Sequence, residues 1–382
     1  MEPEKMRISI YGMIRLTTLL LMVTTMTGVA VNRLVPSNPI NWILDFGQPW
    51  TVAKHNLHKP AEQNLILDLE HDQEILLPIK PNEKLELISI SPFSNEKGNR
   101  QMVCRRQSSS LNGSSNLPGD VELVRMSFPN MEILESRSVD WLPNSLPAWD
   151  IDTSHGLKTV FSTGSGSLVR VDWEDKLGRA VSHKGQLIHW DVDPPFGNQT
   201  FVSDPEWVSD NNFPNRILVA LWGISPVSRT FHAGLAWLDL NEDRTTIEAY
   251  GILIDKDLGM VNNAQFFRNP VSKTDRNGQT QIAWQDHLRE ESGWTTRTAF
   301  LEEVPGSTKP ARNWRLGASQ WVASGCLNTK VAFDEQSQNL YLIVPKSADC
   351  YDGGYWRKHR LLDQQELVTQ TDRRPLISMR AD

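Results

Sequence analysis

The chain contains many short segments in which apolar and polar residues alternate, and Pro, Gly, Asn or Asp residues bound them. Alternation with a period of two puts alternate side chains on opposite faces of a β-strand. The clearest examples are residues 64–70, 84–90 and 166–173. Helical periodicity is scarce, and its best candidate is a short amphipathic turn over 361–369. Many short strands with turn residues between them predict an all-β fold, namely a sandwich, a barrel or a propeller.

A repeat after residue 120 favours the propeller. Each unit opens with an aromatic residue, continues through a turn-rich gap and then contains two apolar strands. The opening aromatics are Trp149, Trp207, Phe266 and Phe333. Their spacing of roughly 60 residues is that of sheet units that stack to bury their faces. We therefore expect a β-propeller of about six four-stranded blades, with each aromatic filling the gap to the next blade.

The strands expected in these four units can be given by their residue numbers. They are 157–162 and 167–172, then 216–222 and 234–240, then 280–284 and 296–301, and finally 339–344 and 354–357.

The Pro-x-Trp openings at Pro147 to Trp149 and at Pro205 to Trp207, with a later apolar strand and a closing strand containing Asp-Leu, resemble the repeats of TolB-like or WD-like propellers. The resemblance covers about residues 140–360. The Ser-Pro-Asp-Gly tetrad of TolB-like repeats is absent after both tryptophans. The resemblance implies an architecture shared by translocation-complex proteins, peptidase propellers and lyases, so it does not fix a function.

The N-terminus has the order of a signal peptide. Lys5, Arg7 and Arg15 precede an apolar run that ends in small residues. This order predicts export to a secreted or periplasmic location with cleavage after Ala30, and an uncleaved N-terminal membrane anchor is the alternative. We expect a β-rich region over 31–119 that ends in a Ser, Asn and Gly-rich loop. This region is either a separate module or the first blades, and propeller repeats follow over 120–382.

The net charge narrows the possible binding partners of the chain. The net charge of −7 argues against nucleic acid as a partner, because proteins that bind nucleic acid carry a basic excess.

In an exported chain, Cys326 and Cys350 are the expected disulfide pair, because a hairpin-like segment lies between them. Cys104 is then expected to be a buried small hydrophobic residue, or else a reactive thiol.

Paired carboxylates are the candidate catalytic groups. They are Asp150, Asp172, Asp191, Asp193 and Asp204. Two carboxylates in one cavity are what glycoside hydrolysis requires, whereas Asp beside Pro or Gly also caps turns. The densest polar and aromatic cluster runs from His189 to Pro195, and His189 and Trp190 are the candidate ligand-binding residues.

The main functional hypothesis is an exported binding or interaction protein with a protein or glycan partner. No cofactor or metal is expected, and membrane contact is expected only through an uncleaved N-terminus. The alternative is a carbohydrate-active or other hydrolytic enzyme that uses paired carboxylates near the propeller axis.

Overall fold

The computed structural model describes the strands in residues 42–108 and 320–375 and most of the chain between residues 121 and 319. The described ranges are 42–44, 50–55, 63–68, 73–77, 83–94, 100–108, 121–128, 130–150, 156–174, 184–208, 212–260, 267–274, 278–287, 295–304, 313–324, 330–333, 339–344, 355–362 and 366–375. The expected signal peptide, Cys326, Cys350 and Phe266 lie outside these ranges. The signal peptide and the disulfide therefore stay predictions.

No helix in the described residues combines the length and the apolar character needed to cross a bilayer.

The strands form antiparallel meanders of four. The first sheet contains β1 (Trp42–Leu44), β2 (Trp50–His55), β3 (Gln63–Asp68) and β4 (Gln73–Leu77). The second contains β5 (Glu83–Ser94), β6 (Arg100–Ser108), β7 (Val121–Phe128) and β8 (Ile133–Ser138). Strands β6 and β7 flank the Ser, Asn and Gly-rich segment and pair with each other, so both sides of that segment belong to one sheet.

An eight-stranded sheet follows, made of two such meanders. The first meander contains β9 (Ala148–Trp149), β10 (Lys158–Ser162), β11 (Leu168–Asp172) and β12 (Gln186–Trp190). The second contains β13 (Phe201–Trp207), β14 (Arg216–Ile224), β15 (Phe231–Leu240) and β16 (Thr246–Asp257). A short parallel pairing between β12 and β16 joins them, and the 3-10 helix η2 (Gly197–Gln199) lies in the connection from β12 to β13.

Two further sheets complete the described chain. One contains β17 (Phe267–Thr274), β18 (Thr280–Asp286), β19 (Thr295–Glu303), β20 (Trp314–Leu316) and β21 (Gln320–Ser324). The last contains β22 (Lys330–Phe333), β23 (Asn339–Val344), β24 (Tyr355–Leu362) and β25 (Glu366–Pro375).

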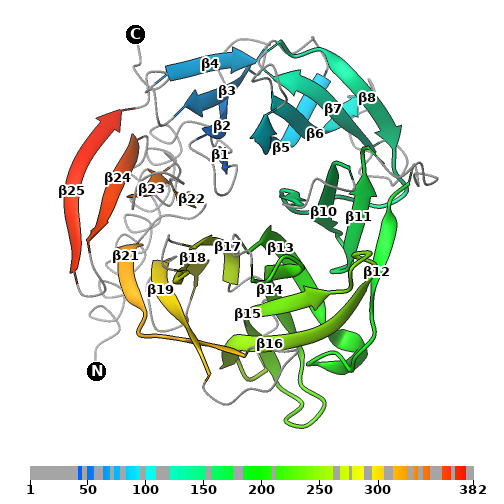
Figure 1. Cartoon of the computed structure of the whole chain (residues 1–382), viewed down its shortest axis with the longest axis vertical. Coiled ribbons are helices and arrows are strands. Elements are labelled where there is room, and N and C mark those ends of the chain that lie inside the picture. Colours follow the sequence, from blue (N-terminus) through cyan, green and yellow to red (C-terminus); the bar gives the residue numbers. More distant parts are fainter. Residues whose placement is uncertain are drawn as a thin grey trace, which may run out of the picture.

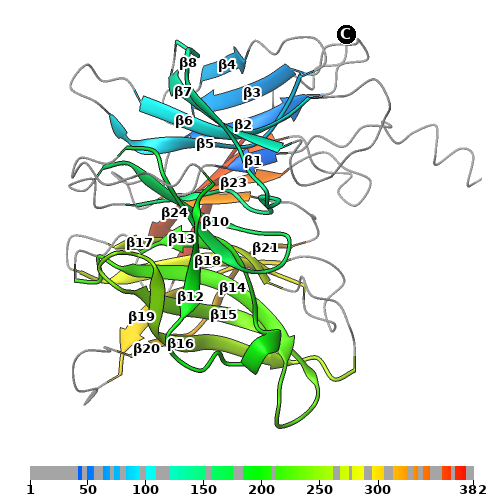
Figure 2. The same cartoon turned by 90° about the vertical axis from the view of Figure 1, so that its right-hand side faces the viewer.

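The meanders are arranged around a common centre, with β5, β13, β17 and β22 facing it and β4, β8, β16 and β25 at the outside (Figure 1). The side view places β1–β4 and β5–β8 opposite β13–β16 (Figure 2). First strands of successive meanders touch, since β1 contacts both β22 and β5, and β13 contacts both β9 and β17. The link from β5 to β9 is the Trp149 indole, which donates a hydrogen bond of 2.7 Å to Ser89 Oγ. The fold is therefore an all-β ring of the propeller type.

The strands expected from the repeat are present. The expected ranges coincide with β10 and β11, β14 and β15, β18 and β19, and β23 and β24. The helical turn expected over 361–369 is wrong, because 361–362 end β24 and 366–369 begin β25, and these two strands pair with each other. Over so short a window the spacing of the leucines fits both the helical period of 3.6 and the strand period of 2. The pairing of β24 with β25 selects the strand.

Three of the four opening aromatics end the first strands of their meanders. They are Trp149, Trp207 and Phe333, of which Trp149 and Trp207 are buried. Phe266, in contrast, directly precedes β17. The feature that β13 and β17 do share is an Asx-Pro step with a positive φ, at Asp204 and Asn269, where the pairing of each strand shifts register. The aromatic repeat therefore aligns three of the four units and fails for the unit that begins with β17.

The core lies between sheets. One apolar cluster joins β10, β11 and β12 to β13–β16, and a second joins β14 and β15 to β18, β19 and β20. Cys104 is fully buried in a third cluster beside Met102 and Val124, as expected for a small hydrophobic residue. Burial between the faces of neighbouring meanders is the physical reason that single four-stranded sheets associate here.

Candidate functional site

The connection from β12 to β13 shapes the candidate site. Strand β12 ends at Trp190, which pairs with Ile247 of β16, and Asp191 N donates to Ile247 O at 3.0 Å. Two prolines then prevent the chain from continuing the ladder. Gly197 adopts φ 57° and its N–H donates to Pro194 O at 2.9 Å, which turns the chain into η2 and back toward β13.

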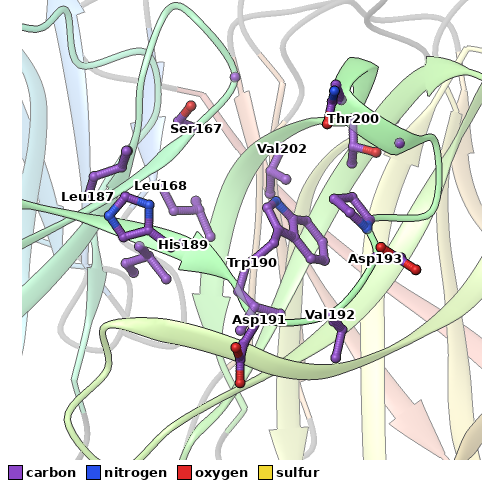
Figure 3. A pocket seen from close by; sticks show the side chains of 16 residues that line it. Ser167, Leu168, Leu187, His189, Trp190, Asp191, Val192, Asp193, Thr200 and Val202 are labelled. Atoms are coloured by element: carbon purple, nitrogen blue, oxygen red, sulfur yellow. The ribbon is translucent and has the colours of Figure 1, made fainter.

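This turn encloses a cavity of about 740 Å³, which we call the Trp190 cavity. Its walls come from β12, the β12–β13 connection, the β10–β11 turn and the first part of β13, with Ile247 from β16. Figure 3 shows the Trp190 indole in the middle of the labelled side chains, near Val202. The indole also packs edge-on against Tyr250, with ring centroids 5.8 Å apart, and this contact orients the Trp190 ring.

A close backbone approach forms the wall beside the β10–β11 turn. Val202 N donates to Gly166 O at 2.8 Å, which ties β13 to that turn. Gly166 has φ 77°, and a Cβ at this position would lie 2.5 Å from a ring carbon of Phe201. Phe201 in turn stacks on Trp222, with 5.9 Å between centroids and 9° between ring planes. Only glycine fits at this point of the rim.

The polar groups of the cavity are exposed carboxylates and an exposed amide, with partly buried hydroxyls, around a half-buried indole. The lining includes His189, Asp191, Asp193, Asn198 and Thr200. Thr200 Oγ1 accepts a hydrogen bond of 2.8 Å from Phe196 N, which fixes the loop. The sequence cluster from His189 to Pro195 therefore does form one wall of a cavity. The sequence did not assign Asn198, Thr200 or Ser167 to this site, and they join the cavity through the loop geometry.

Of the five candidate carboxylates, Asp191 and Asp193 line the same cavity. They lie on different sides of Trp190, and their carboxylates do not face each other (Figure 3). The cavity can therefore offer acceptors at two places around one aromatic ring.

Asp150 and Asp172 serve ion pairs away from this cavity. Asp150 is buried, and its Oδ2 lies 3.0 Å from Nε of Arg244, which is buried in the turn between β15 and β16. Asp172 Oδ2 accepts a hydrogen bond of 2.8 Å from Arg170 Nη2. Burial lowers the pKa of the nearby Lys158, while the charges of Asp150 and Asp172 raise it. These two carboxylates compensate buried positive charge, as buried ions require.

Asp204 occupies a backbone irregularity. Its φ is 49° at the register shift of β13, and its carboxylate accepts hydrogen bonds of 3.4 Å from Asn269 N and Ser203 Oγ. Asp tolerates this left-handed conformation better than most residues do. Its contacts join β13 to β17, so the structure gives Asp204 a role between neighbouring first strands.

Within the described ranges, no group of three or more His, Cys, Asp and Glu side chains is placed to hold a metal ion.

No family model matches this chain, and no curated protein matches it either. The resemblance to TolB-like and WD-like repeats is thus supported only as a propeller-like, all-β arrangement. Similar solved structures include an endo-1,4-beta-xylanase from Bacteroides thetaiotaomicron, with 10% identity, a TM-score of 0.43 and coverage of 76% of this chain and 95% of that chain. A putative 6-phosphogluconolactonase from Bacteroides fragilis has 8% identity, a TM-score of 0.43 and coverage of 89% and 96%. An endo-1,5-alpha-L-arabinanase from Thermotoga petrophila has 11% identity, a TM-score of 0.36 and coverage of 86% and 94%.

Proposed function

We propose that the Trp190 cavity binds a carbohydrate and that the chain is a six-bladed propeller built around this and similar surface sites. The observation that carries the proposal is a half-buried indole surrounded by carboxylate, amide and hydroxyl groups in one cavity. An indole face covers the apolar face of a sugar ring, and the surrounding oxygens and amides pair with its hydroxyls.

The size and the exposure of the cavity support a small polar ligand. Its volume of about 740 Å³ lies in the range of small-molecule sites, roughly 300–1,000 Å³. Asp191 and Asp193 are both exposed, so neither needs a buried counter-ion, and both can accept hydrogen bonds from hydroxyl groups. The negative charge of the pair disfavours anionic ligands, which makes a neutral saccharide the best match.

Hydrolysis is the second candidate function, because two carboxylates line the one cavity. An inverting mechanism needs its carboxyl groups about 6.5–9.5 Å apart across the scissile bond, and a retaining one about 5–5.5 Å. Asp191 and Asp193 lie around Trp190 instead of facing each other, which favours binding over cleavage (Figure 3). Release of reducing ends from the bound glycan, abolished by both Asp191→Asn and Asp193→Asn, would establish cleavage.

A glycan array tests the binding proposal. Wild-type protein, Trp190→Ala and Trp141→Phe are applied to the same array. Trp141 packs on Phe161 away from the cavity and is the matched control. We expect wild-type protein and the control to bind a common set of neutral glycans and Trp190→Ala to lose them. Binding retained by Trp190→Ala would contradict the proposal, as would a folded wild-type protein that binds no neutral glycan.

The blade count has its own support. The six first strands β1, β5, β9, β13, β17 and β22 each begin an antiparallel meander, and the meander that starts at β17 has a fifth strand, β21, paired with β19. The contacts of these first strands, with the Trp149–Ser89 hydrogen bond between β9 and β5, run around the ring. Six falls within the usual range of about 4–8 blades. An experimental density map with another number of radial sheets would contradict this count.

A further inference from the structure

The pairing of β15 with β16 gathers a histidine and two aspartates on one face. His232 lies opposite Asp257, and Gly234 lies opposite Asp255. Residues two apart in a strand share a face, so Asp255 and Asp257 both project on the side of His232. His232 Nδ1 lies 2.8 Å from Asp255 Oδ1, and His232 Nε2 lies 3.9 Å from Asp257 Oδ2. The imidazole is therefore held between two carboxylates.

The turn between β14 and β15 adds two hydroxyl groups to this face. Ser225 N donates to Thr230 O at 3.0 Å, and Arg229 adopts φ 62°, which closes the turn tightly. Ser228 Oγ and Thr230 Oγ1 each lie 3.2 Å from His232 Nε2, and they lie 2.6 Å from each other. Ser228 is exposed, whereas His232 is largely shielded from solvent.

The Asp255 carboxylate at Nδ1 favours the neutral tautomer of His232 that carries its proton on Nδ1 and its lone pair on Nε2. The Thr230 hydroxyl donates to Asp257, whose pKa is lowered chiefly by the N–H of Gly259 and then by this hydroxyl. The Ser228 hydroxyl can then donate either to Thr230 Oγ1 at 2.6 Å or to His232 Nε2 at 3.2 Å. The chain of contacts from Ser228 through His232 to Asp255 has the connectivity of a nucleophile, a general base and an orienting carboxylate.

We propose that Ser228, His232 and Asp255 form a serine-type hydrolytic centre for small carboxylic esters, separate from the Trp190 cavity. Ser228 Oγ attacks the ester carbonyl carbon while its proton passes to His232 Nε2. The tetrahedral intermediate then breaks its bond to the alcohol oxygen, which takes that proton. Water attacks the acyl-serine by the same route and releases the carboxylic acid, which restores Ser228. Asp255 is the positioning residue that keeps the imidazole in the required tautomer.

The turn also contains donors for the developing oxyanion. The N–H groups of Val227 and Ser228 donate to Ser225 Oγ over 3.3 Å each, which is at the long limit of such bonds. The N–H of a nucleophilic serine is a usual member of an oxyanion hole. Val227 is 91% exposed and offers an apolar contact beside Ser228. These features suit a small, apolar acyl group.

Active-site labelling tests this centre. The full chain is incubated with a fluorophosphonate, digested and examined by mass spectrometry. We expect the label on Ser228 in the folded protein, no label after denaturation and no label at this position in Ser228→Ala. Ser138→Ala is the matched control, because Ser138 is exposed in β8, and it should keep the label on Ser228. A folded wild-type protein that leaves Ser228 unlabelled would overturn the proposal.

Hydrolysis of p-nitrophenyl acetate tests the role of Asp255. Asp255→Asn is expected to lower kcat at least about tenfold while leaving KM within about twofold, because it changes the tautomer of His232 and not the binding of the ester. Ser228→Ala should abolish the enzymatic hydrolysis of this ester. Equal loss of kcat and of folded protein in Asp255→Asn would show a purely structural network and would also overturn the proposal. The outcome is independent of any glycan bound at Trp190.

Discussion

Arg216 and Asp239 face each other across β14 and β15 and form a two-point ion pair, with 2.6 Å from Nε to Oδ1 and 2.8 Å from Nη2 to Oδ2. The guanidinium is fully buried and lies 3.9 Å from the ring centroid of Trp237 and 4.4 Å from that of Trp314. Trp314 begins β20, so this cation joins two neighbouring meanders. The bidentate carboxylate compensates the charge of the buried arginine, and the aromatic rings pack against the faces of its guanidinium.

Removal of the Arg216 side chain should destabilise the packing between these two meanders. Arg216→Met leaves Asp239 without its partner and opens the aromatic cluster, at a cost of about 3 kcal/mol in the free energy of unfolding. Arg315→Met is the control, because Arg315 and Glu302 pair at the surface, where such pairs contribute under about 1 kcal/mol. Urea denaturation measures both changes. Equal changes for the two variants would contradict this role of Arg216.

Asp150 should affect stability and not binding. Asp150→Asn removes the charge that compensates buried Arg244, and we expect a loss on the order of 3 kcal/mol in the free energy of unfolding. Glycan affinity should stay within about twofold, because the pair lies away from the Trp190 cavity. Calorimetry on wild-type protein and variant compares Tm and Kd. A lowered affinity with an unchanged Tm would contradict this structural role and make Asp150 a candidate site carboxylate again.

Gly166 should be intolerant of a side chain. In Gly166→Ala the left-handed backbone costs about 1–2 kcal/mol, and the new Cβ pushes the Phe201 ring away from the rim of the cavity. Gly278 has a similar φ of 78° but open space around it, so Gly278→Ala reports the backbone cost alone. We expect both variants to lower Tm and only Gly166→Ala to weaken glycan binding. Unchanged binding in Gly166→Ala would show that the position of Phe201 does not matter.

Acid should weaken the hairpin that contains Asp257. The N–H of Gly259, which donates to Asp257 Oδ1 at 2.8 Å, and the Thr230 hydroxyl lower the pKa of this carboxyl below its ordinary value of 3.8. A depressed pKa means that the unfolded state binds more protons, so the stabilisation is complete above the unfolded pKa and is lost as pH falls through the folded pKa. Urea denaturation from neutral to acidic pH should show wild-type protein converging on Asp257→Asn at low pH. A constant difference at all pH values would contradict this assignment.

Much of the fold could be predicted from the sequence, because single strands carry a local signal. The runs that became β14 and β15 alternate or are wholly apolar, and both are buried as expected. The aromatics aligned three units correctly, because Trp149, Trp207 and Phe333 end β9, β13 and β22. They misaligned the unit of β17, because Phe266 precedes that strand. The shared Asx-Pro steps at Asp204 and Asn269 were visible in the sequence, but their positive φ values appear only in the structure.

The candidate site was predictable only where its residues are neighbours in sequence. Residues 189–193 line one cavity because they follow each other around a single loop. Asp150 looked equivalent to Asp191 until its partner was known, and Arg244 is far away in sequence. The same holds for His232 and Asp255, which the β15–β16 pairing brings together. The spacing of Asp255 and Asp257 along one strand was the available signal for that face.

Isothermal titration of Trp190→Ala tests the central claim most directly. The neutral glycan bound best by wild-type protein on the array is titrated into wild-type protein, Trp190→Ala and Trp141→Phe. We predict that Trp190→Ala raises Kd at least about tenfold, because a stacked ring contributes about 1–3 kcal/mol by analogy with bases on aromatic platforms, and that Trp141→Phe binds like wild-type protein. The Trp190→Ala variant should remain folded but have a lower Tm, because the indole also packs on Tyr250 and the core. Equal Kd values for wild-type protein and a folded Trp190→Ala would contradict carbohydrate binding in this cavity.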